Sequence, residues 1–153
     1  MKKVAIAVAM ILFASLPFSA TGQEAKTFTG DDLKWGPASP ALPTGAQGAA
    51  LVGDPSKEGF YVVRVKFPAG YKIAPHSHPN DENVTVISGT FHIATGDKFD
   101  DTKGTALKAG GFAQAPKGVK HYAWASQETV IQLHGMGPQN LIYVNETDDP
   151  RKK

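Results

Sequence analysis

From residue 60 onward, short runs rich in apolar and β-branched residues are separated by glycine, proline and aspartate. Runs of this length and composition are typical of β-strands. The expected strands are Phe60–Phe67, Tyr71–Ala74, Asn83–Ser88, Phe91–Thr95, Phe112–Ala115, His121–Ala125, Val130–His134 and Leu141–Val144. Because no amphipathic helical pattern lies between them, the chain is predicted to be all-β, with one antiparallel sandwich or jelly roll.

The first residues have a different pattern. Two lysines begin residues 1–22, an uncharged apolar run follows over Val4–Leu16, and small residues lie around Gly22. This order is typical of a cleaved secretory signal peptide, and the apolar run is short for an uncleaved membrane anchor. We therefore predict a secreted or periplasmic protein that has no membrane association after cleavage.

The segment between the signal peptide and the first strand shows no periodicity. Residues 23–58 are rich in glycine, proline and alanine, and we interpret them as an irregular arm that packs on the barrel through Trp35 and Leu51. The barrel domain is then expected over residues 59–146, and residues 147–153 are expected to form a C-terminal tail, with Arg151, Lys152 and Lys153 solvated.

Charge and cysteine content exclude several classes of function. Removal of residues 1–22 takes away two lysines and leaves 14 basic against 14 acidic side chains, so neither nucleic acid nor an anionic membrane is an expected partner. The 153-residue chain has no cysteine, which excludes disulfides, thiol catalysis and thiolate ligands. Stability must come from the core, from a bound metal or from association such as a homodimer, and only histidine and carboxylate remain as strong metal ligands.

One segment combines such ligands at short spacing. His76 and His78 are two residues apart, so on a strand they point to the same face, and Glu82 follows after a Pro-Asn-Asp turn. Two imidazoles and a carboxylate suit a divalent transition-metal ion. A second strand–turn–strand segment ends at His121, which is the expected fourth ligand. A polar cluster without metal is the alternative interpretation.

These two segments together resemble the cupin family. The first reads Gly, five residues, His-x-His, three residues, Glu, six residues, Gly, from Gly70 to Gly89. The second reads Gly, five residues, Pro-x-Gly, two residues, His, from Gly110 to His121. The chain as a whole is similar to small, exported, single-domain bacterial cupins. It departs from the pattern at Ala125, where the second motif usually has asparagine.

The resemblance implies a two-sheet barrel in which His76, His78, Glu82 and His121 hold one Fe, Mn, Ni, Co or Zn ion. It also implies that open coordination positions face the barrel mouth, where a substrate can bind.

Several further positions were considered as parts of a substrate pocket. Ala125 shares a strand face with His121 and is expected to line the barrel interior. Gln114 and Gln132 are the expected polar pocket residues, and His134 is a candidate proton shuttle or hydrogen-bonding partner of a ligand. By contrast, four residues are expected on outer or solvated strand faces: Arg64, His92, Tyr122 and Trp124.

Cupin barrels support many reactions, so the resemblance leaves function open. Our first hypothesis is a metal-dependent enzyme of the dioxygenase type that acts on a small oxygenated molecule, with Glu82 as ligand and base. The second is a non-catalytic periplasmic module that binds a small ligand or senses a metal. A metal-free isomerase is a third hypothesis, which the full ligand set disfavours.

Overall fold

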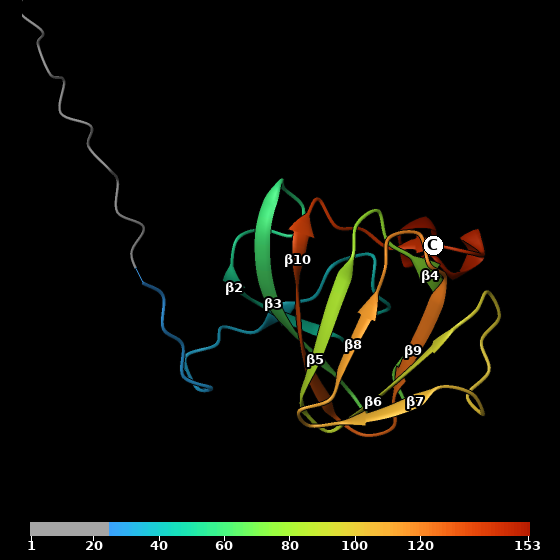
Figure 1. Ribbon diagram of the computed structural model, residues 1–153, viewed down its shortest axis with the longest axis horizontal. Helices are drawn as coiled ribbons and strands as arrows, with labels where there is room; N and C mark the ends of the chain where they lie inside the picture. Colours follow the sequence, from blue (N-terminus) through green and yellow to red (C-terminus); the bar gives the residue numbers. More distant parts are fainter. Residues whose placement is uncertain (1–24) are drawn as a thin grey trace, which may run out of the picture.

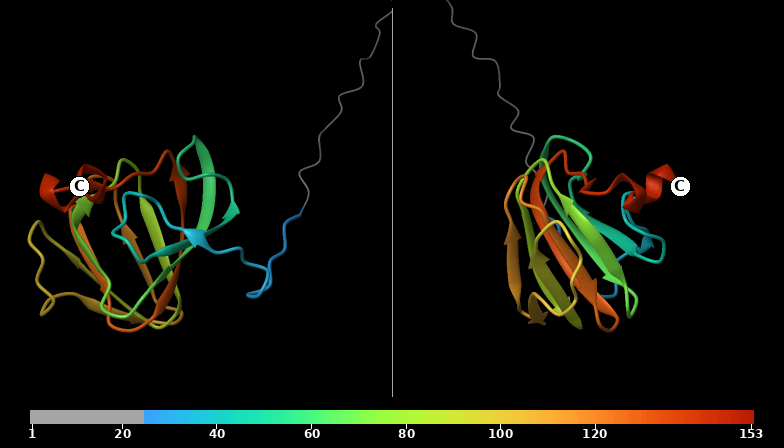
Figure 2. Two further views of the ribbon diagram at one scale, coloured as in Figure 1. Left: turned by 180° about the vertical axis from the view of Figure 1, so that it is seen from behind. Right: turned by 90° about the vertical axis from the view of Figure 1, so that its right-hand side faces the viewer.

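The computed structural model describes residues 25–153, so the predicted signal peptide at residues 1–22 lies outside the described part. Within residues 25–153, none of the helices has the length and hydropathy of a membrane span. The regular secondary structure of the described chain is almost entirely β, and its strands form two facing sheets (Figures 1 and 2).

Both sheets are antiparallel. The larger sheet has six strands, in the spatial order β1 (Gly36–Pro37), β2 (Gln47–Val52), β3 (Gly59–Phe67), β10 (Thr129–Gly137), β5 (Glu82–Ser88) and β8 (Phe112–Ala115). The smaller sheet has five strands, in the order β11 (Ile142–Tyr143), β4 (Lys72–Ser77), β9 (His121–Ala125), β6 (Thr90–Thr95) and β7 (Thr105–Lys108). This arrangement confirms the predicted all-β jelly-roll barrel.

The expected strands agree with the observed ones to within a few residues, and two of them, β8 and β9, have the predicted bounds. The strand β7 was not predicted. Its sequence, Thr-Ala-Leu-Lys, has one large apolar side chain and little intrinsic β propensity. It forms because residues Thr90–Ile93 of β6 offer an antiparallel partner.

The arm over residues 23–58 is more ordered than expected. It packs on the barrel, but Gln47–Val52 forms β2, which extends the larger sheet by pairing with β3. The sequence Gln-Gly-Ala-Ala-Leu-Val conceals this strand because glycine and alanine are weak strand formers. The predicted anchor Trp35 lies under the Lys66 ammonium group, 4.5 Å from the ring centre.

The apolar core fills one end of the barrel. Phe67 stacks on Tyr71 and on Phe91, with ring centres 4.9 and 5.8 Å apart. The core residues come from both sheets, and they include Val65, Phe67, Ile73, Val84, Val86, Phe91, Ala123, Ala125 and Ile131. In the pairing of β3, β10 and β5, Phe67 and Glu82 belong to opposite ends of β10, next to Thr129 and Gly135. The histidine motif therefore occupies the end of the barrel away from the aromatic core.

Position 89 of the motif requires glycine for a structural reason. Gly89 turns the chain from β5 into β6 with φ of +82°, and a Cβ atom there would lie 2.4 Å from the Glu128 carbonyl oxygen. Only glycine fits this conformation and this close approach. The turn places β5, which carries Glu82, and β6 in opposite sheets of the barrel.

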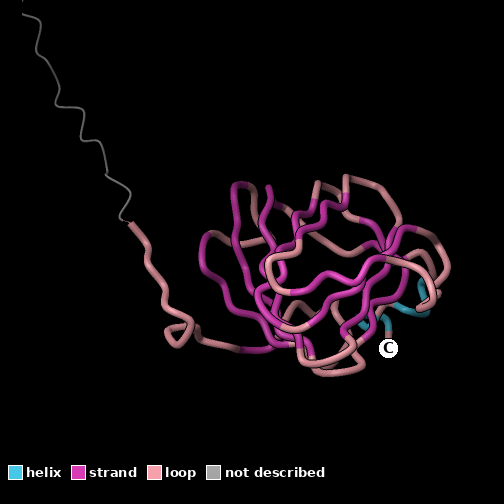
Figure 3. The backbone as a smooth tube through the Cα atoms, turned by 60° about the horizontal axis from the view of Figure 1, so that its bottom comes forward, coloured by secondary structure: helices cyan, strands magenta, loops and turns pink. Residues whose placement is uncertain are grey.

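The C-terminal residues 147–153 are more ordered than the expected tail, although Arg151, Lys152 and Lys153 are exposed. They contain parts of two short 3-10 helices, η1 (Glu146–Asp148) and η2 (Pro150–Lys152), which lie beside β4 (Figure 1) and appear as the short helical turns near the C-terminus in Figure 3. Arg151 holds them, because its guanidinium donates to Asp149, to Asn140 Oδ1 at 2.7 Å and to the Leu141 carbonyl at 2.9 Å. Such a fork of donors can bind several acceptors at once.

Candidate metal centre

The four predicted ligands come together at one end of the barrel. His76 is in β4, His78 follows this strand, His121 begins β9, and Glu82 begins β5 of the opposite sheet. His76 and His121 are cross-strand partners. All four residues are buried. Each motif segment connects the two sheets, and the two segments lie side by side because β4 pairs with β9 and β5 pairs with β8.

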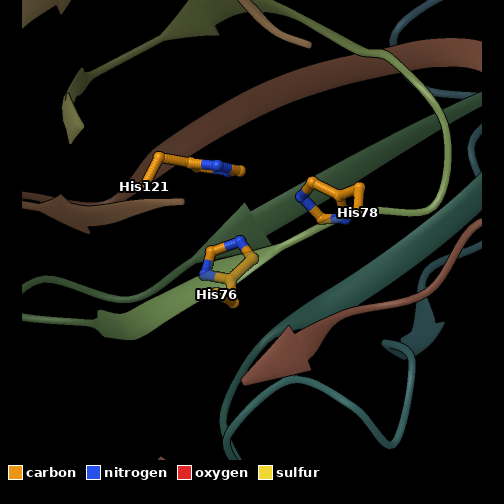
Figure 4. Close-up of side chains that lie close together, drawn as sticks. All are labelled: His76, His78 and His121. Carbon is orange, nitrogen blue, oxygen red and sulfur yellow. The ribbon is translucent and has the colours of Figure 1, made fainter. Parts of the chain in front are cut away.

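The three imidazole rings point toward one another (Figure 4). One ring nitrogen from each of His76, His78 and His121 can be chosen so that all three lie within 4.8 Å of one another. Glu82 approaches from the other sheet, with Oε2 at 3.3 Å from His78 Nε2 and 4.0 Å from His121 Nε2. The compact group is therefore a set of three histidines, with the carboxylate at its side.

Backbone carbonyls orient all three rings. In each ring Nδ1 lies at hydrogen-bond distance from a carbonyl oxygen, in the pairs His76–Ala74 (2.7 Å), His78–Asn140 (2.8 Å) and His121–Val119 (3.0 Å). A carbonyl only accepts, so Nδ1 carries the proton and donates, which leaves the lone pair of each neutral ring on Nε2. This arrangement fixes rings for metal binding in many proteins.

The centre also contains a buried ring nitrogen without a hydrogen-bond partner. The Nε2 atom of His78 is buried and has no hydrogen-bond partner, because its approach to Glu82 lacks the geometry of a hydrogen bond. A buried polar atom without a partner is costly. A metal ion at this point would satisfy it, so the residues present fit a divalent transition-metal ion.

Burial and charge affect the histidines differently. Burial, together with the neighbouring rings of His121 and His78, lowers the pKa of His76 to about 3. Burial also lowers the pKa of His121. For His78 burial acts in the same direction, but the Glu82 carboxylate outweighs it and raises the pKa. The pKa of Glu82 is lowered, since the three histidines outweigh the effect of its burial. Without metal, the centre thus holds two neutral rings and one ion pair.

A small cavity of about 50 Å³ adjoins the ligands. One water needs roughly 10–15 Å³ of such volume, so the cavity holds an ion and a few small ligand atoms. Its other lining side chains are apolar, and two of them, Leu42 of the arm and Leu141 after β10, close the barrel end from distant parts of the chain. Neither residue belongs to a motif, so their place in the cavity could not be predicted.

Two of the three polar pocket residues were predicted wrongly. Gln132 and His134 alternate with the inward-facing Leu133 of β10, so they lie on the outer face, where Gln132 accepts a hydrogen bond from Arg64. The third, Gln114, is exposed and donates to Asn83, and it lines a groove on the side of the barrel rather than the cavity beside the histidines.

Ala125 faces the barrel interior as expected, but its environment differs from the expected one. It is 1% exposed and packs in the apolar core, while the cavity ends at Ala123 of the same strand face. Ala125 therefore lies behind Ala123 rather than in contact with the cavity.

The remaining aromatic residues of the smaller sheet lie where the sequence predicts them. His92 and Trp124 are on its outer face and stack with ring centres 4.7 Å apart. Tyr122 is on the same face, under Phe99 of the loop that precedes β7. His92 is thus separated from the three-histidine group by the sheet itself.

Two further polar residues near Glu82 were missed by the sequence analysis. The Tyr61 hydroxyl and the side-chain amide of Gln139 are buried without hydrogen-bond partners. Burial, and then the charge of Glu82, raises the pKa of Tyr61 to about 12, so the phenol stays protonated and can donate. Neither residue belongs to a motif, and only the packing of β3 against the segment after β10 reveals them.

The C-terminal arginine supports one of the ligands indirectly. Arg151 binds the Asn140 side chain, and the Asn140 carbonyl accepts the hydrogen bond from His78 Nδ1. We expect Arg151→Ala to weaken metal binding by about tenfold, the lower end of the cost of losing the outer partners of a ligand, because Arg151 reaches His78 only through Asn140. Lys152→Ala, which removes only the exposed pair with Glu146, is the matched control.

The measurement is a competition titration with a chromophoric chelator on both variants. Equal affinities for the two variants would show that the tail does not support His78.

A two-sheet antiparallel barrel with an inward His-x-His pair and a third histidine from a second hairpin is a cupin. The model of the ChrR cupin-like domain family matches residues 23–140, and the chain belongs to this family. No curated protein matches the chain.

Solved structures show the same fold at low sequence identity. The polyketide cyclase RemF from Streptomyces resistomycificus matches with a TM-score of 0.63 and 16% identity, over 84% of this chain and 92% of its own. An acetylacetone dioxygenase from Acinetobacter johnsonii matches with a TM-score of 0.63 and 16% identity, over 90% and 88%. KdgF from Halomonas sp. matches with a TM-score of 0.55 and 22% identity, over 74% and 96%. These similarities establish the fold and not the reaction.

Proposed function

We propose that the protein is an exported, mononuclear metal-dependent enzyme of the dioxygenase type, which acts on a small oxygenated molecule. One observation carries the proposal. Three buried imidazoles, each oriented through Nδ1 by a carbonyl, direct their free nitrogens to one point beside a buried carboxylate. A structural role would not require the adjoining cavity or the nearby carboxylate.

The four residues would have different roles. His76, His78 and His121 would hold the ion, and Glu82 would be a fourth ligand or a nearby base. A bound divalent transition-metal ion supplies Lewis acidity and coordination positions for oxygen-containing ligands. The Glu82 carboxylate, whose pKa is lowered, is ionised at neutral pH and can accept a proton from a bound substrate. The apolar lining of the cavity limits access of water.

One comparison supports this class of reaction without deciding it, and another points to a different reaction. The acetylacetone dioxygenase has the same fold, and so does a polyketide cyclase, whose name indicates another reaction. A three-histidine centre with space for small ligands suits an enzyme that coordinates an oxygenated substrate. The export of the mature chain and a homodimer stay predictions from the sequence.

The small size of the cavity favours an alternative. About 50 Å³ leaves no space for an organic substrate within the barrel. The protein would then be a periplasmic module that binds or senses a metal or a small ligand without catalysis.

The parent protein and its Glu82→Gln variant distinguish the metal-dependent enzyme from the non-catalytic module. We expect the parent, reconstituted in turn with Fe, Mn, Co, Ni or Zn, to hold about one ion per chain, as one cluster implies. With at least one of these metals it should consume dioxygen with a β-diketone such as acetylacetone. Glu82→Gln should retain most of the metal and lose turnover by about 100-fold or more, because the glutamine cannot accept a proton.

Metal content is measured by elemental analysis and turnover with an oxygen electrode, with Glu128→Gln, far from the centre, as control. A parent that binds one ion but consumes no dioxygen with any metal or diketone would support the non-catalytic module.

A further inference from the structure

A groove on the side of the barrel leads to the candidate metal centre. It has a volume of about 440 Å³ and shares two lining residues, Ile93 and His121, with the cavity beside the ligands. Three other hollows of the described surface have similar volumes, of about 470, 510 and 430 Å³, but share no lining residue with that cavity. The groove is thus the route from the described surface that reaches a ligand.

The groove exists because the two sheets do not close on this side. The strand β7 is the edge of the smaller sheet and β8 is the edge of the larger one. The two strands follow one another in the chain and diverge from their connection (Figure 1). Since β7 and β8 do not pair, the barrel interior is accessible between them.

Small side chains keep this opening free. On β8, Ala113 and Ala115 line the groove, and Ala115 is the cross-strand partner of Glu82. On the opposite wall, Thr105 pairs with Ile93, and Thr95 pairs with His121. The groove therefore has an apolar wall, a wall with two hydroxyl groups, and a candidate ligand at its inner end.

The volumes of the groove and the cavity suit different parts of a ligand. Ligand pockets commonly measure about 300–1,000 Å³, a range that includes the groove and excludes the cavity. An organic molecule can thus place only its coordinating atoms beside the histidines. At the rim, Lys103 and Asp100 form an exposed ion pair at 3.3 Å, so opposite charges lie together there.

We propose that the groove between β7 and β8 is the binding site for the organic body of the ligand. The ligand is a compact, uncharged molecule with a chelating oxygen pair at one end and a largely apolar body that lies between Ala113 and Thr105. This inference rests on the proposed metal centre. If it holds, Ala113 and Thr105 determine how large a ligand the groove accepts.

The test uses two chelators that share one metal-binding group. Acetohydroxamate is small, whereas benzohydroxamate adds a phenyl ring that must lie in the groove. The mature protein is loaded with cobalt, and binding of azide, acetohydroxamate and benzohydroxamate is followed through the visible spectrum. The variants are Ala113→Phe and Thr105→Phe, which fill the groove from opposite walls. The control is Ala106→Phe, at an exposed position of β7 that does not line the groove.

We expect all four proteins to retain cobalt and to bind azide equally. Each groove variant should bind benzohydroxamate at least about tenfold more weakly than the parent, because the added ring occupies the space of the phenyl group. The loss for acetohydroxamate should be smaller, and Ala106→Phe should bind all three as the parent does. Either groove variant alone tests the proposal if the other fails to fold.

Benzohydroxamate binding that is unchanged in a folded groove variant would overturn the proposal, as would a parent that binds azide but not benzohydroxamate. A parent that retains no cobalt would instead contradict the metal centre, and with it the proposed function, so the two failures are distinguishable.

Discussion

His121→Ala should reduce the affinity for a divalent transition metal by more than about 100-fold, while His92→Ala should leave it unchanged. His121 contributes one of the three converging ring nitrogens. His92 lies on the outer face of the same sheet, where it stacks on Trp124. The two substitutions remove the same side chain from neighbouring strands, so they differ mainly in the face of the sheet that is affected.

The measurement is elemental analysis after dialysis against a chelator of known affinity, with circular dichroism to establish that both variants fold. Removal of His121 leaves a cavity and unpairs the Val119 carbonyl, so some loss of stability is expected as well. If the two folded variants retained equal amounts of metal, His121 would not be a ligand.

Metal binding near pH 6 should release about one proton per ion rather than three. The pKa of His76 is lowered to about 3 and that of His121 is also lowered, so both rings are already neutral. The Glu82 carboxylate raises the pKa of His78, which keeps its proton to a higher pH than an ordinary histidine. Only His78 must therefore lose a proton before its Nε2 can bind an ion.

The direction of the pH dependence follows from this raised pKa. Below the pKa of His78 the proton competes with the metal, so the apparent association constant should increase by about tenfold per pH unit. Above that pKa it should become constant. Three ordinary histidines would instead give a slope approaching three at low pH.

Proton release is measured with an indicator in weakly buffered solution, and the slope by competition titrations at several pH values. Glu82→Gln is the informative variant, because loss of the carboxylate should lower the pKa of His78 and move the dependence to more acidic pH. A release of three protons in the parent would contradict the electrostatic description of the centre.

The predictions from the sequence succeeded where the relevant geometry is local. His76 and His78 point to the same side because side chains alternate along a strand, and a short turn from β4 to β5 brings Glu82 beside them. The predicted hairpins are connections between the two sheets, and His121 reaches His76 through the pairing of β9 with β4. The glycine at position 89 is likewise explained by its own turn. These short-range relations are set by spacing, so the motif predicted the group of residues without knowledge of the fold.

The prediction of the pocket residues failed because alternation along a strand shows which side chains share a face, but not which of the two faces points inward. In β10 the register against β5 shifts between Val130 and Ile131, and the sequence contains no sign of this irregularity. A change of one residue moves a side chain to the other face. Gln132 and His134 consequently lie outside. In β8 the same uncertainty hid Ala113 and Ala115, which line the groove together with the predicted Gln114.

What the sequence determined by itself is thus the all-β class and the set of histidines and carboxylate. The tertiary structure decided which elements surround them. The pairing of β2 with β3, the binding of Arg151 to Asn140 and the closure of the cavity by Leu42 and Leu141 all join residues far apart in the chain. The groove between β7 and β8 depends on where two sheet edges stop. Such contacts depend on the packing of the whole barrel, because each residue that makes them has a composition typical of a loop, a tail or a weak strand.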